Sequence, residues 1–184
     1  EVARRHSSHD VATRTIDYRG GTSVEDLAEE VLCEGMGDGV GGDDDPRFDA
    51  VCVLEVVEHA TDPAGLLRSA ARLVRPGGIL FVSTVNRTAK SYGLTILAAE
   101  HLLRMVPVGT HTWSQYLGPA EVGQMVTGGS AVAAAAADEE KSSGMEVLDV
   151  CGMVIDPHFF TMRWRLDRND LGVNWIGAYR KKIE

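Results

Sequence analysis

The segment Phe48-Asp-Ala-Val-Cys-Val-Leu-Glu-Val-Val-Glu-His59 joins an apolar run to three potential ligands. Residues 48–54 are nearly continuous in apolar character, which is typical of a strand covered on both faces. Glu55, Glu58 and His59 follow at the spacing i, i+3, i+4, so one helical turn would place them on one face. Two carboxylates and an imidazole at close range suit a divalent cation such as Mg²⁺, Mn²⁺ or Zn²⁺. The alternative is a solvated helix start, where acidic residues are favoured by the helix dipole.

A helix and a second strand are predicted to follow this segment. Asp62 is expected to cap a helix that begins at Pro63, and the Pro76-Gly77-Gly78 run is expected to end it. Residues 79–83 then form the next buried strand. A strand–helix–strand order implies parallel pairing through a right-handed crossover. The apolar stripe of the helix consists of Leu66, Leu67, Ala70, Leu73 and Val74.

The remaining elements extend this pattern in both directions. Ser23 is expected to cap a helix over residues 24–32, and Pro119 to begin a short helix through Val126. An amphipathic helix is predicted over residues 91–105, and further strands over residues 15–19, 146–153 and 173–179. This order predicts an open α/β sheet. In such sheets ligands lie beyond the carboxyl ends of the strands, which is where the sequence places Glu55, Glu58 and His59.

Composition limits the function classes. With 184 residues the chain is expected to form one domain, 1–184, with low-complexity insertions at about 35–45 and 127–144. The net charge of −9 argues against binding nucleic acid. The three cysteines, Cys33, Cys52 and Cys151, predict no disulfide framework and a reducing compartment. The chain starts at Glu1 and not at Met, so we expect it to lack an N-terminal portion.

Several motifs carry a family resemblance. Leu54-Glu-Val-Val-Glu-His-Ala-Thr-Asp-Pro63, Leu73-Val-Arg-Pro-Gly-Gly78 and Phe81-Val-Ser-Thr-Val-Asn-Arg-Thr88 resemble class I S-adenosylmethionine-dependent methyltransferases. Leu-x-x-Pro-Gly-Gly before a strand is common throughout that superfamily and indicates the fold alone. More specific segments are similar to the ubiquinone-biosynthesis O-methyltransferases, which methylate polyprenylated catechol intermediates. These segments are residues 83–88, Lys90-Ser91, Ala99-Glu100, residues 106–111 and Val173-Asn174.

The resemblance implies a Rossmann-like methyltransferase sheet with the strand order 3-2-1-4-5-7-6. The predicted strands match strands 3 to 7, so the first two strands would be missing. The family's glycine-rich loop and the acid that ends its second strand are absent from the sequence. The run Gly37-Asp-Gly-Val-Gly-Gly42 precedes a strand and opens no helix, so we reject it as a cofactor loop. We therefore expect the chain alone to bind S-adenosylmethionine weakly and to be inactive.

The resemblance also assigns site residues. Glu55, Glu58 and His59 match the family's ligands for a divalent metal, with Mg²⁺ expected, and Leu54 matches a contact to S-adenosylmethionine. Asn86, Arg87 and His111 are candidates for the substrate pocket, although ordinary loop structure explains them almost as well. His158, Phe159 and Phe160 could cover a prenyl tail or form a core edge. Trp113 and Tyr116 are expected to pack within the protein and not to stack on a ligand.

Partners and location follow from the same resemblance. The segment 91–108, which begins at Ser91 and ends at Val108, is expected either to lie on a membrane surface or to pack on its own domain. The resemblance implies a polyprenylated catechol substrate, other ubiquinone-biosynthesis proteins as partners, and the matrix side of the mitochondrial inner membrane, with a bacterial cytoplasm as the alternative. Two rival functions stay open: methylation of another small hydroxylated substrate, and a non-catalytic lipid-binding or scaffold role.

Overall fold

The computed structural model describes residues 12–13, 15–34, 45–102, 104, 107–110, 112–129, 143–156 and 163–183. Most of the two predicted insertions lies outside these residues. The same is true of His111 and of the aromatic cluster His158, Phe159 and Phe160. Among the described helices, none is long and apolar enough to cross a membrane.

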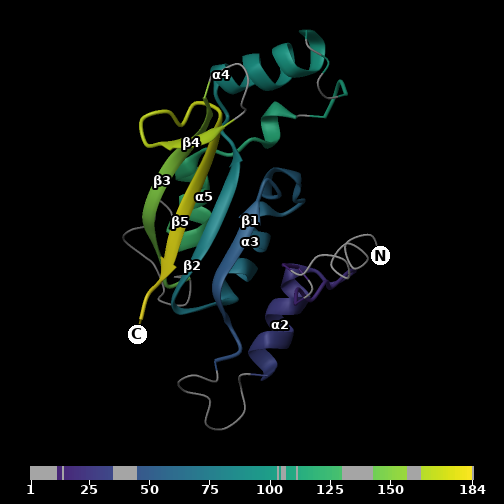
Figure 1. Ribbon diagram of the computed structural model, residues 1–184. Helices are drawn as coiled ribbons and strands as arrows, with labels where there is room; N and C mark the ends of the chain where they lie inside the picture. Colours follow the sequence, from purple (N-terminus) through teal and green to yellow (C-terminus); the bar gives the residue numbers. More distant parts are fainter. Residues whose placement is uncertain are drawn as a thin grey trace.

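Five strands form one mixed sheet (Figure 1). In chain order they are β1 (Phe48–Leu54), β2 (Val74–Val85), β3 (Met145–Ile155), β4 (Trp164–Asp167) and β5 (Asn174–Lys181). Their spatial order is β1-β2-β5-β3-β4. The predicted parallel pairing of β1 with β2 is confirmed, and the other neighbouring strands are antiparallel. The order β1-β2-β5-β3 reproduces the 4-5-7-6 half of the family sheet, and β4 adds a short edge strand that the sequence did not predict.

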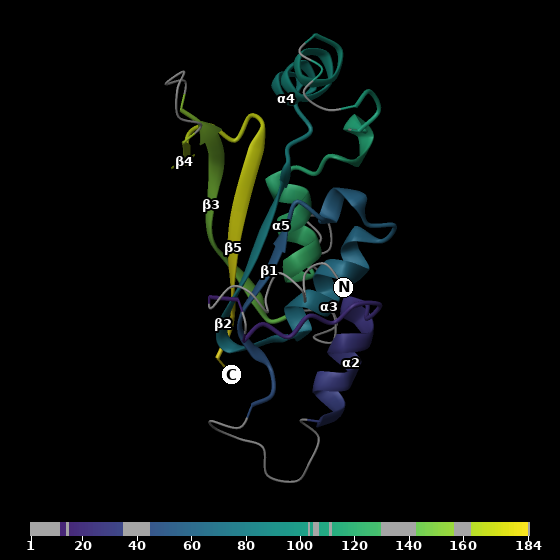
Figure 2. The ribbon, with the colours of Figure 1, turned by 45° about the vertical axis from the view of Figure 1, so that its right-hand side comes forward.

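Three helices lie on one side of the sheet (Figure 2). They are α2 (Val24–Glu34), α3 (Pro63–Arg72) and α5 (Pro119–Thr127). Two of the predicted caps are confirmed. The Ser23 hydroxyl accepts from the backbone N–H of Asp26 at 3.1 Å, and the Asp62 carboxylate accepts from the N–H of Gly65 at 2.9 Å. These caps satisfy helix-end donors that would otherwise have no partner.

The core lies between the sheet and these helices. Val53, Leu80, Val82 and Trp175 of the strands pack with Leu67, Ala70, Val122 and Val126 of α3 and α5. The opposite side of the sheet differs, because the described helices do not cover it. Cys52 and Leu54, which alternate with buried Val53, are exposed there. The prediction that β1 is covered on both faces is therefore wrong for the described residues, although its bounds are as predicted.

Three other predicted elements differ from the structure. The strand predicted over 79–83 is longer, because β2 begins at Val74, which was predicted for the helix, and includes the Pro76-Gly77-Gly78 run. Residues 16–20 have no regular structure, so the predicted strand over 15–19 is wrong. β1 is the edge strand of the described sheet, and residues 16–20 form no strand hydrogen bonds with it. Arg19 instead forms ion pairs with Asp17 and with Glu30 of α2.

The segment after β2 is not the predicted α-helix. A short turn, α4 (Ala89–Ser91), leads into η2 (Tyr92–Leu102), which winds as a π-helix. The Thr95 hydroxyl donates to the Ser91 carbonyl at 2.8 Å, in competition with the backbone bond of an α-helix.

Candidate active site

Two carboxylates follow β1 and are held by hydroxyls of the neighbouring strand. The register pairs Leu54 with Ser83, so the residues that follow Leu54 lie against the carboxyl end of β2. The Ser83 hydroxyl donates to Glu55 Oε1 at 2.8 Å. The Thr84 hydroxyl donates to Glu58 Oε2 at 2.7 Å. The position predicted from the sequence, beyond the carboxyl ends of parallel strands, is therefore where the two carboxylates lie.

The local backbone is not the helical turn predicted from the spacing. Glu55 has φ of 53°, in the left-handed region that residues other than glycine rarely adopt. Only residues Val57–His59 form a single 3₁₀ turn, η1. Val57 is fully buried and anchors this turn in the core. As a result Glu58 is buried while His59 and Glu55 keep exposed surface, and the three side chains do not share one helical face.

All three side chains nevertheless line one cavity of about 220 Å³. Its other walls come from the end of β2 and from the segment before α5. Hydrogen bonds to the sheet help to hold that segment in place: Leu117 N–H donates to the Val85 carbonyl at 3.1 Å, and Trp175 Nε1 donates to the Leu117 carbonyl at 2.9 Å. The lining residues beyond the two acids and His59 are Val85, Thr110, Thr112, Gln115 and Tyr116.

The electrostatics of the cavity disfavour its negative charges. Burial raises the pKa of the Glu55 carboxyl, and the nearby charge of Glu58 raises it further, while the Ser83 hydrogen bond opposes both effects. Burial also raises the pKa of the Tyr116 phenol, against the hydrogen bond that it shares with Thr95 at 2.8 Å. A ligand that brings positive charge into this cavity would relieve the repulsion between Glu55 and Glu58.

The fit to a metal ion is partial. The donor types suit a hard divalent cation, and all three predicted ligands face the same cavity. However, the described part of the chain contains no group of three acidic, histidine or cysteine side chains placed closely enough to hold a metal. Ser83 and Thr84 occupy one oxygen of each carboxylate, and Asn174 Nδ2 donates to Glu55 Oε2 at 3.3 Å.

The other predicted site residues lie at the edges of this region. Leu54, the predicted cofactor contact, is exposed at the end of β1 on the side without helices. Asn86 Nδ2 donates to the Leu171 carbonyl at 2.7 Å. Arg87 forms an ion pair with Glu121 of α5. Neither Asn86 nor Arg87 lines the cavity, so their substrate roles stay predictions, as does that of His111, which lies outside the described residues.

Sequence reasoning missed several members of the site. Ser83 and Thr84 carried a usable signal, because they are polar residues at the carboxyl end of a buried strand, as Glu55 is. Tyr116 was expected to pack in the core, and it is buried, but its ring also lines the cavity. Asn174 lies 119 residues from Glu55 in the sequence, so only the folded sheet shows their contact.

A second cavity, of about 270 Å³, lies beside the first. We call it the apolar cavity because six apolar side chains line it: Leu94, Met153, Val154, Ile155, Trp164 and Val173. Its polar lining residues are Lys90, Asp170 and Asn174. Asn174, which lines this cavity, donates to Glu55, which lines the first, so this hydrogen bond joins the linings of the two cavities.

Comparisons with known proteins agree with this architecture. A protein-family profile described as a methyltransferase domain matches residues 4–137. The ubiquinone biosynthesis O-methyltransferase of Cereibacter sphaeroides is 35% identical over 177 residues, which cover 96% of this chain and 58% of that protein. The mitochondrial ubiquinone biosynthesis O-methyltransferase of Arabidopsis thaliana is 35% identical over 185 residues, which cover 100% of this chain and 48% of that protein.

A solved structure also matches. The SAM-dependent methyltransferase of Thermotoga maritima, described as a possible histamine N-methyltransferase, has 16% identity and a TM-score of 0.47, covering 73% of this chain and 56% of that one. This chain spans about half the length of the curated relatives it matches. From the profile match and the sheet order together, the chain belongs to the methyltransferase-domain family and has the class I methyltransferase fold.

Proposed function

We propose that the protein transfers a methyl group from S-adenosylmethionine to a hydroxyl of a polyprenylated catechol intermediate in ubiquinone biosynthesis. The observation that carries the proposal is the acidic cavity at the carboxyl ends of β1 and β2, lined by Glu55, Glu58 and His59. Support for the substrate class comes from the relatives, which are named ubiquinone biosynthesis O-methyltransferases.

The residues of the cavity suit the acceptor side of this reaction. As the bond from oxygen to the methyl carbon forms and the bond from carbon to sulfur breaks, the acceptor hydroxyl loses its proton. Without a bound cation Glu55 would take this proton, because its raised pKa makes its carboxylate a stronger base than a fully solvated glutamate. A cation held by Glu55 would instead favour loss of the proton by lowering the pKa of the catechol hydroxyl. Glu58, fixed by Thr84, and the phenol of Tyr116 would orient the catechol ring. Holding oxygen, carbon and sulfur in line contributes about 7–11 kcal/mol when the geometry is good.

The methyl-donor side is only partly formed by the described residues. Leu54 offers an exposed apolar contact at the end of β1, next to Glu55. Among the described residues no glycine-rich loop follows a strand and opens a helix, and the rejected run at 37–42 lies outside them. The proposed donor contact is therefore Leu54 alone.

We further propose that Glu55, Glu58 and His59 take a divalent cation, Mg²⁺ in the first instance. The donor chemistry and the shared cavity support this, and a bound cation would act as a Lewis acid toward the catechol oxygens. Mixing MgCl₂ with the chain in a calorimeter tests this step without any activity. Saturable binding in the parent and its loss in Glu58→Gln support the site, and equal heats from both would overturn it.

The activity is tested on the longest natural form of this protein with a farnesylated catechol. Glu55→Gln and Glu58→Gln are each expected to lower kcat/KM at least about 100-fold, within the range for general acid–base groups. Glu29→Gln, an exposed position on α2, is the matched control and should be unchanged. Full turnover in both site variants would refute the assignment, and a parent that turns over only a soluble catechol would favour the rival substrate class.

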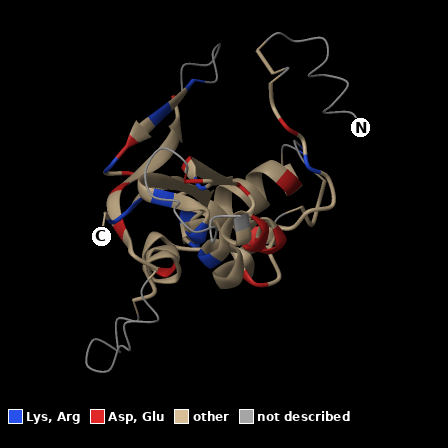
Figure 3. Ribbon diagram, turned by 90° about the horizontal axis from the view of Figure 1, so that it is seen from below, with Lys and Arg blue, Asp and Glu red and all other residues tan. Residues whose placement is uncertain are grey.

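Location and partners belong to the same proposal. We propose that the segment 91–108 contacts a membrane surface, because η2 presents exposed Leu94, Leu97 and Leu102. The mitochondrial name of the plant relative supports a mitochondrial location, with the bacterial cytoplasm as the alternative. Other ubiquinone-biosynthesis proteins are proposed partners. Nucleic acid is not, because the net charge is −9. Figure 3 shows acidic and basic residues on the same parts of the ribbon, and Arg168 and Arg180 are paired with Asp149 and Glu146.

A further inference from the structure

The apolar cavity has the properties of a site for a hydrocarbon chain. Six of its lining side chains are apolar. Its one cationic residue, Lys90, is paired, since Nζ contacts both Asp170 oxygens at 2.8 and 2.7 Å. No unpaired positive charge therefore faces an anionic ligand from this lining, and the chemistry of the walls selects an uncharged, apolar ligand.

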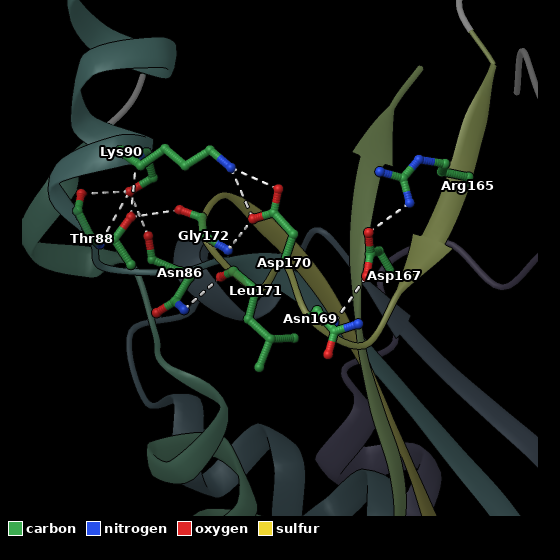
Figure 4. A network of polar contacts seen from close by, with 10 residues as sticks. Asn86, Thr88, Lys90, Arg165, Asp167, Asn169, Asp170, Leu171 and Gly172 are labelled. Carbon is green, nitrogen blue, oxygen red and sulfur yellow. Dashed lines mark hydrogen bonds and ion pairs between the residues drawn. The ribbon is translucent and has the colours of Figure 1, made fainter. Parts of the chain in front are cut away.

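The rim of the cavity is fixed by a network of polar contacts (Figure 4). The loop that precedes β5 is held against the segment that follows β2, because Thr88 Oγ1 donates to the Gly172 carbonyl at 2.5 Å and Asn86 Nδ2 to the Leu171 carbonyl at 2.7 Å. Asp170 adds its pair with Lys90 and accepts from the Gly172 N–H at 3.1 Å. The cavity is thus held open by contacts that do not depend on a ligand, as expected for a preformed site.

The cavity has two ends with different surroundings. At one end Asn174 donates to Glu55, so the lining of this end contacts the lining of the acidic cavity. Toward the outside, Leu94 and Trp164 keep about half of their surface exposed, at 50% and 54%. Its volume of about 270 Å³ lies below the roughly 300–1,000 Å³ of sites that enclose a whole drug-sized ligand. A segment of a longer chain fits these dimensions, with its polar end at Glu55 and the remainder leading outward past Leu94.

We propose that the apolar cavity binds the ring-proximal isoprene units of the methyl acceptor while its catechol ring occupies the acidic cavity. This inference rests on the proposed function. It adds a site that makes the enzyme specific for prenylated acceptors. Val154 and Met153 of β3, Leu94 of η2 and Trp164 of β4 contact the chain, and Asn174 separates chain from ring. The enzyme then distinguishes prenylated from plain catechols through these residues and not through the acidic cavity.

Binding is tested first, without catalysis. Farnesol, which carries the chain but no ring, is titrated into the chain while tryptophan emission is recorded, because Trp164 lines the cavity. Val154→Phe fills the cavity and should weaken farnesol binding at least about tenfold, the order of effect that a change of hydrocarbon fit produces. Val147→Phe is the matched control, since it makes the same change at an exposed position of the same strand outside the lining.

A second cavity variant controls for the case in which Val154→Phe does not fold. Leu94→Asp lies on the half-exposed surface of η2 and should also weaken farnesol binding while circular dichroism stays that of the parent. Saturable binding in the parent that both cavity variants lose and Val147→Phe keeps supports the site. Absence of saturable binding, or equal affinity in all four proteins, overturns it.

Kinetics separate this inference from the proposed function. On the longest natural form, Val154→Phe should lower kcat/KM for a farnesylated catechol at least about tenfold and leave that for plain catechol unchanged. An equal loss on both substrates overturns the chain site while methyl transfer stands. A parent that methylates neither substrate but binds farnesol in the cavity refutes the proposed function and leaves the binding site.

Discussion

Tyr179 has a buried hydroxyl without a hydrogen-bond partner among the described residues. Its ring lies over Gly177, where an added Cβ would come within 2.8 Å of the Tyr179 oxygen. An unsatisfied buried polar group costs about 1–3 kcal/mol, whereas a satisfied one contributes to stability. Among the described residues, the Tyr179 hydroxyl is therefore a buried polar group that opposes folding.

Removing that oxygen should stabilise the protein. Tyr179→Phe is expected to raise the free energy of unfolding by about 1 kcal/mol, because the variant has no polar group to desolvate. Tyr116→Phe is the matched control, since the buried Tyr116 hydroxyl bonds to Thr95 and its loss should lower stability by a similar amount. Urea denaturation of the three proteins measures both changes. Equal destabilisation by the two substitutions would show that the Tyr179 hydroxyl has a partner.

The same group gives a pH dependence with a defined sign. Burial raises the pKa of Tyr179 to about 12, from about 10 in an unfolded chain. Below pH 10 the phenol is neutral in both states, and its contribution is constant. Between about pH 10 and pH 12 the unfolded chain loses this proton while the folded chain keeps it, so stability falls as pH rises. Urea denaturation at about pH 9 and about pH 11 should show a smaller loss for Tyr179→Phe than for the parent, and parallel losses would contradict the shift.

At the scale of elements, η2 is the most unusual segment. It leaves the sheet directly after the site strand β2, and its apolar residues Leu97 and Leu102 are 52% and 78% exposed. One of its residues, Leu94, lines the apolar cavity. A single segment thus connects the proposed membrane surface with the proposed chain site, which is the arrangement a lipid-soluble substrate requires.

Charges on η2 should weaken membrane association. Leu97→Asp and Leu102→Asp are each expected to reduce flotation with anionic liposomes several-fold, because each places a charge where apolar surface would enter the interface. Leu166→Asp on β4, 65% exposed, is the matched control for an exposed leucine elsewhere. If all three variants float with liposomes as the parent does, η2 is not the membrane contact. The same holds if Leu166→Asp reduces flotation as much as the η2 variants.

The elements also show which features the sequence could predict. The bounds of β1 and the start of α3 were predictable, because a bounded apolar run and an Asp-Pro cap are local signals. The π-helical winding of η2 was not, since its apolar spacing fits an α-helix equally well, and contacts such as that from the Thr95 hydroxyl to the Ser91 carbonyl appear only in the structure. The four-residue strand β4 forms only by pairing with β3. In the site, Glu55 and Glu58 carried a spacing signal, while the turn at Glu55 and the contact to Asn174 depend on the assembled sheet.

At the scale of the whole molecule, the sheet has one covered and one open side. The register places Cys52 beside Phe81 and Leu54 beside Ser83 on the side away from α3 and α5. β1 is also the edge strand of the described sheet, with no described strand on its outer side. Leu54, the proposed contact of the methyl donor, lies at this open corner. Cys52 and Leu54 face solvent there, whereas Ser83 is buried beneath the Glu55 carboxylate that it contacts.

The reactivity of the three cysteines reports on this open side. Cys33 and Cys52 are exposed, whereas Cys151 is buried, and burial together with the charge of Asp149 raises the pKa of the Cys151 thiol. Single-cysteine variants, made by changing the other two residues to Ser, separate the three thiols. With a thiol-reactive dye, Cys52 should react at a rate similar to Cys33 and at least about tenfold faster than Cys151, because the thiolate is the reactive form and needs access.

The labelling rate of Cys52 is interpreted relative to that of Cys33. Cys33 on α2 is the internal standard for an exposed thiol, so a change of buffer or dye affects both sites alike. If Cys52 reacts as slowly as Cys151, the side of the sheet away from α3 and α5 is covered in solution. Reaction of Cys52 at the rate of Cys33 would confirm that this side, with Leu54 at its corner, is open to solvent and to a ligand.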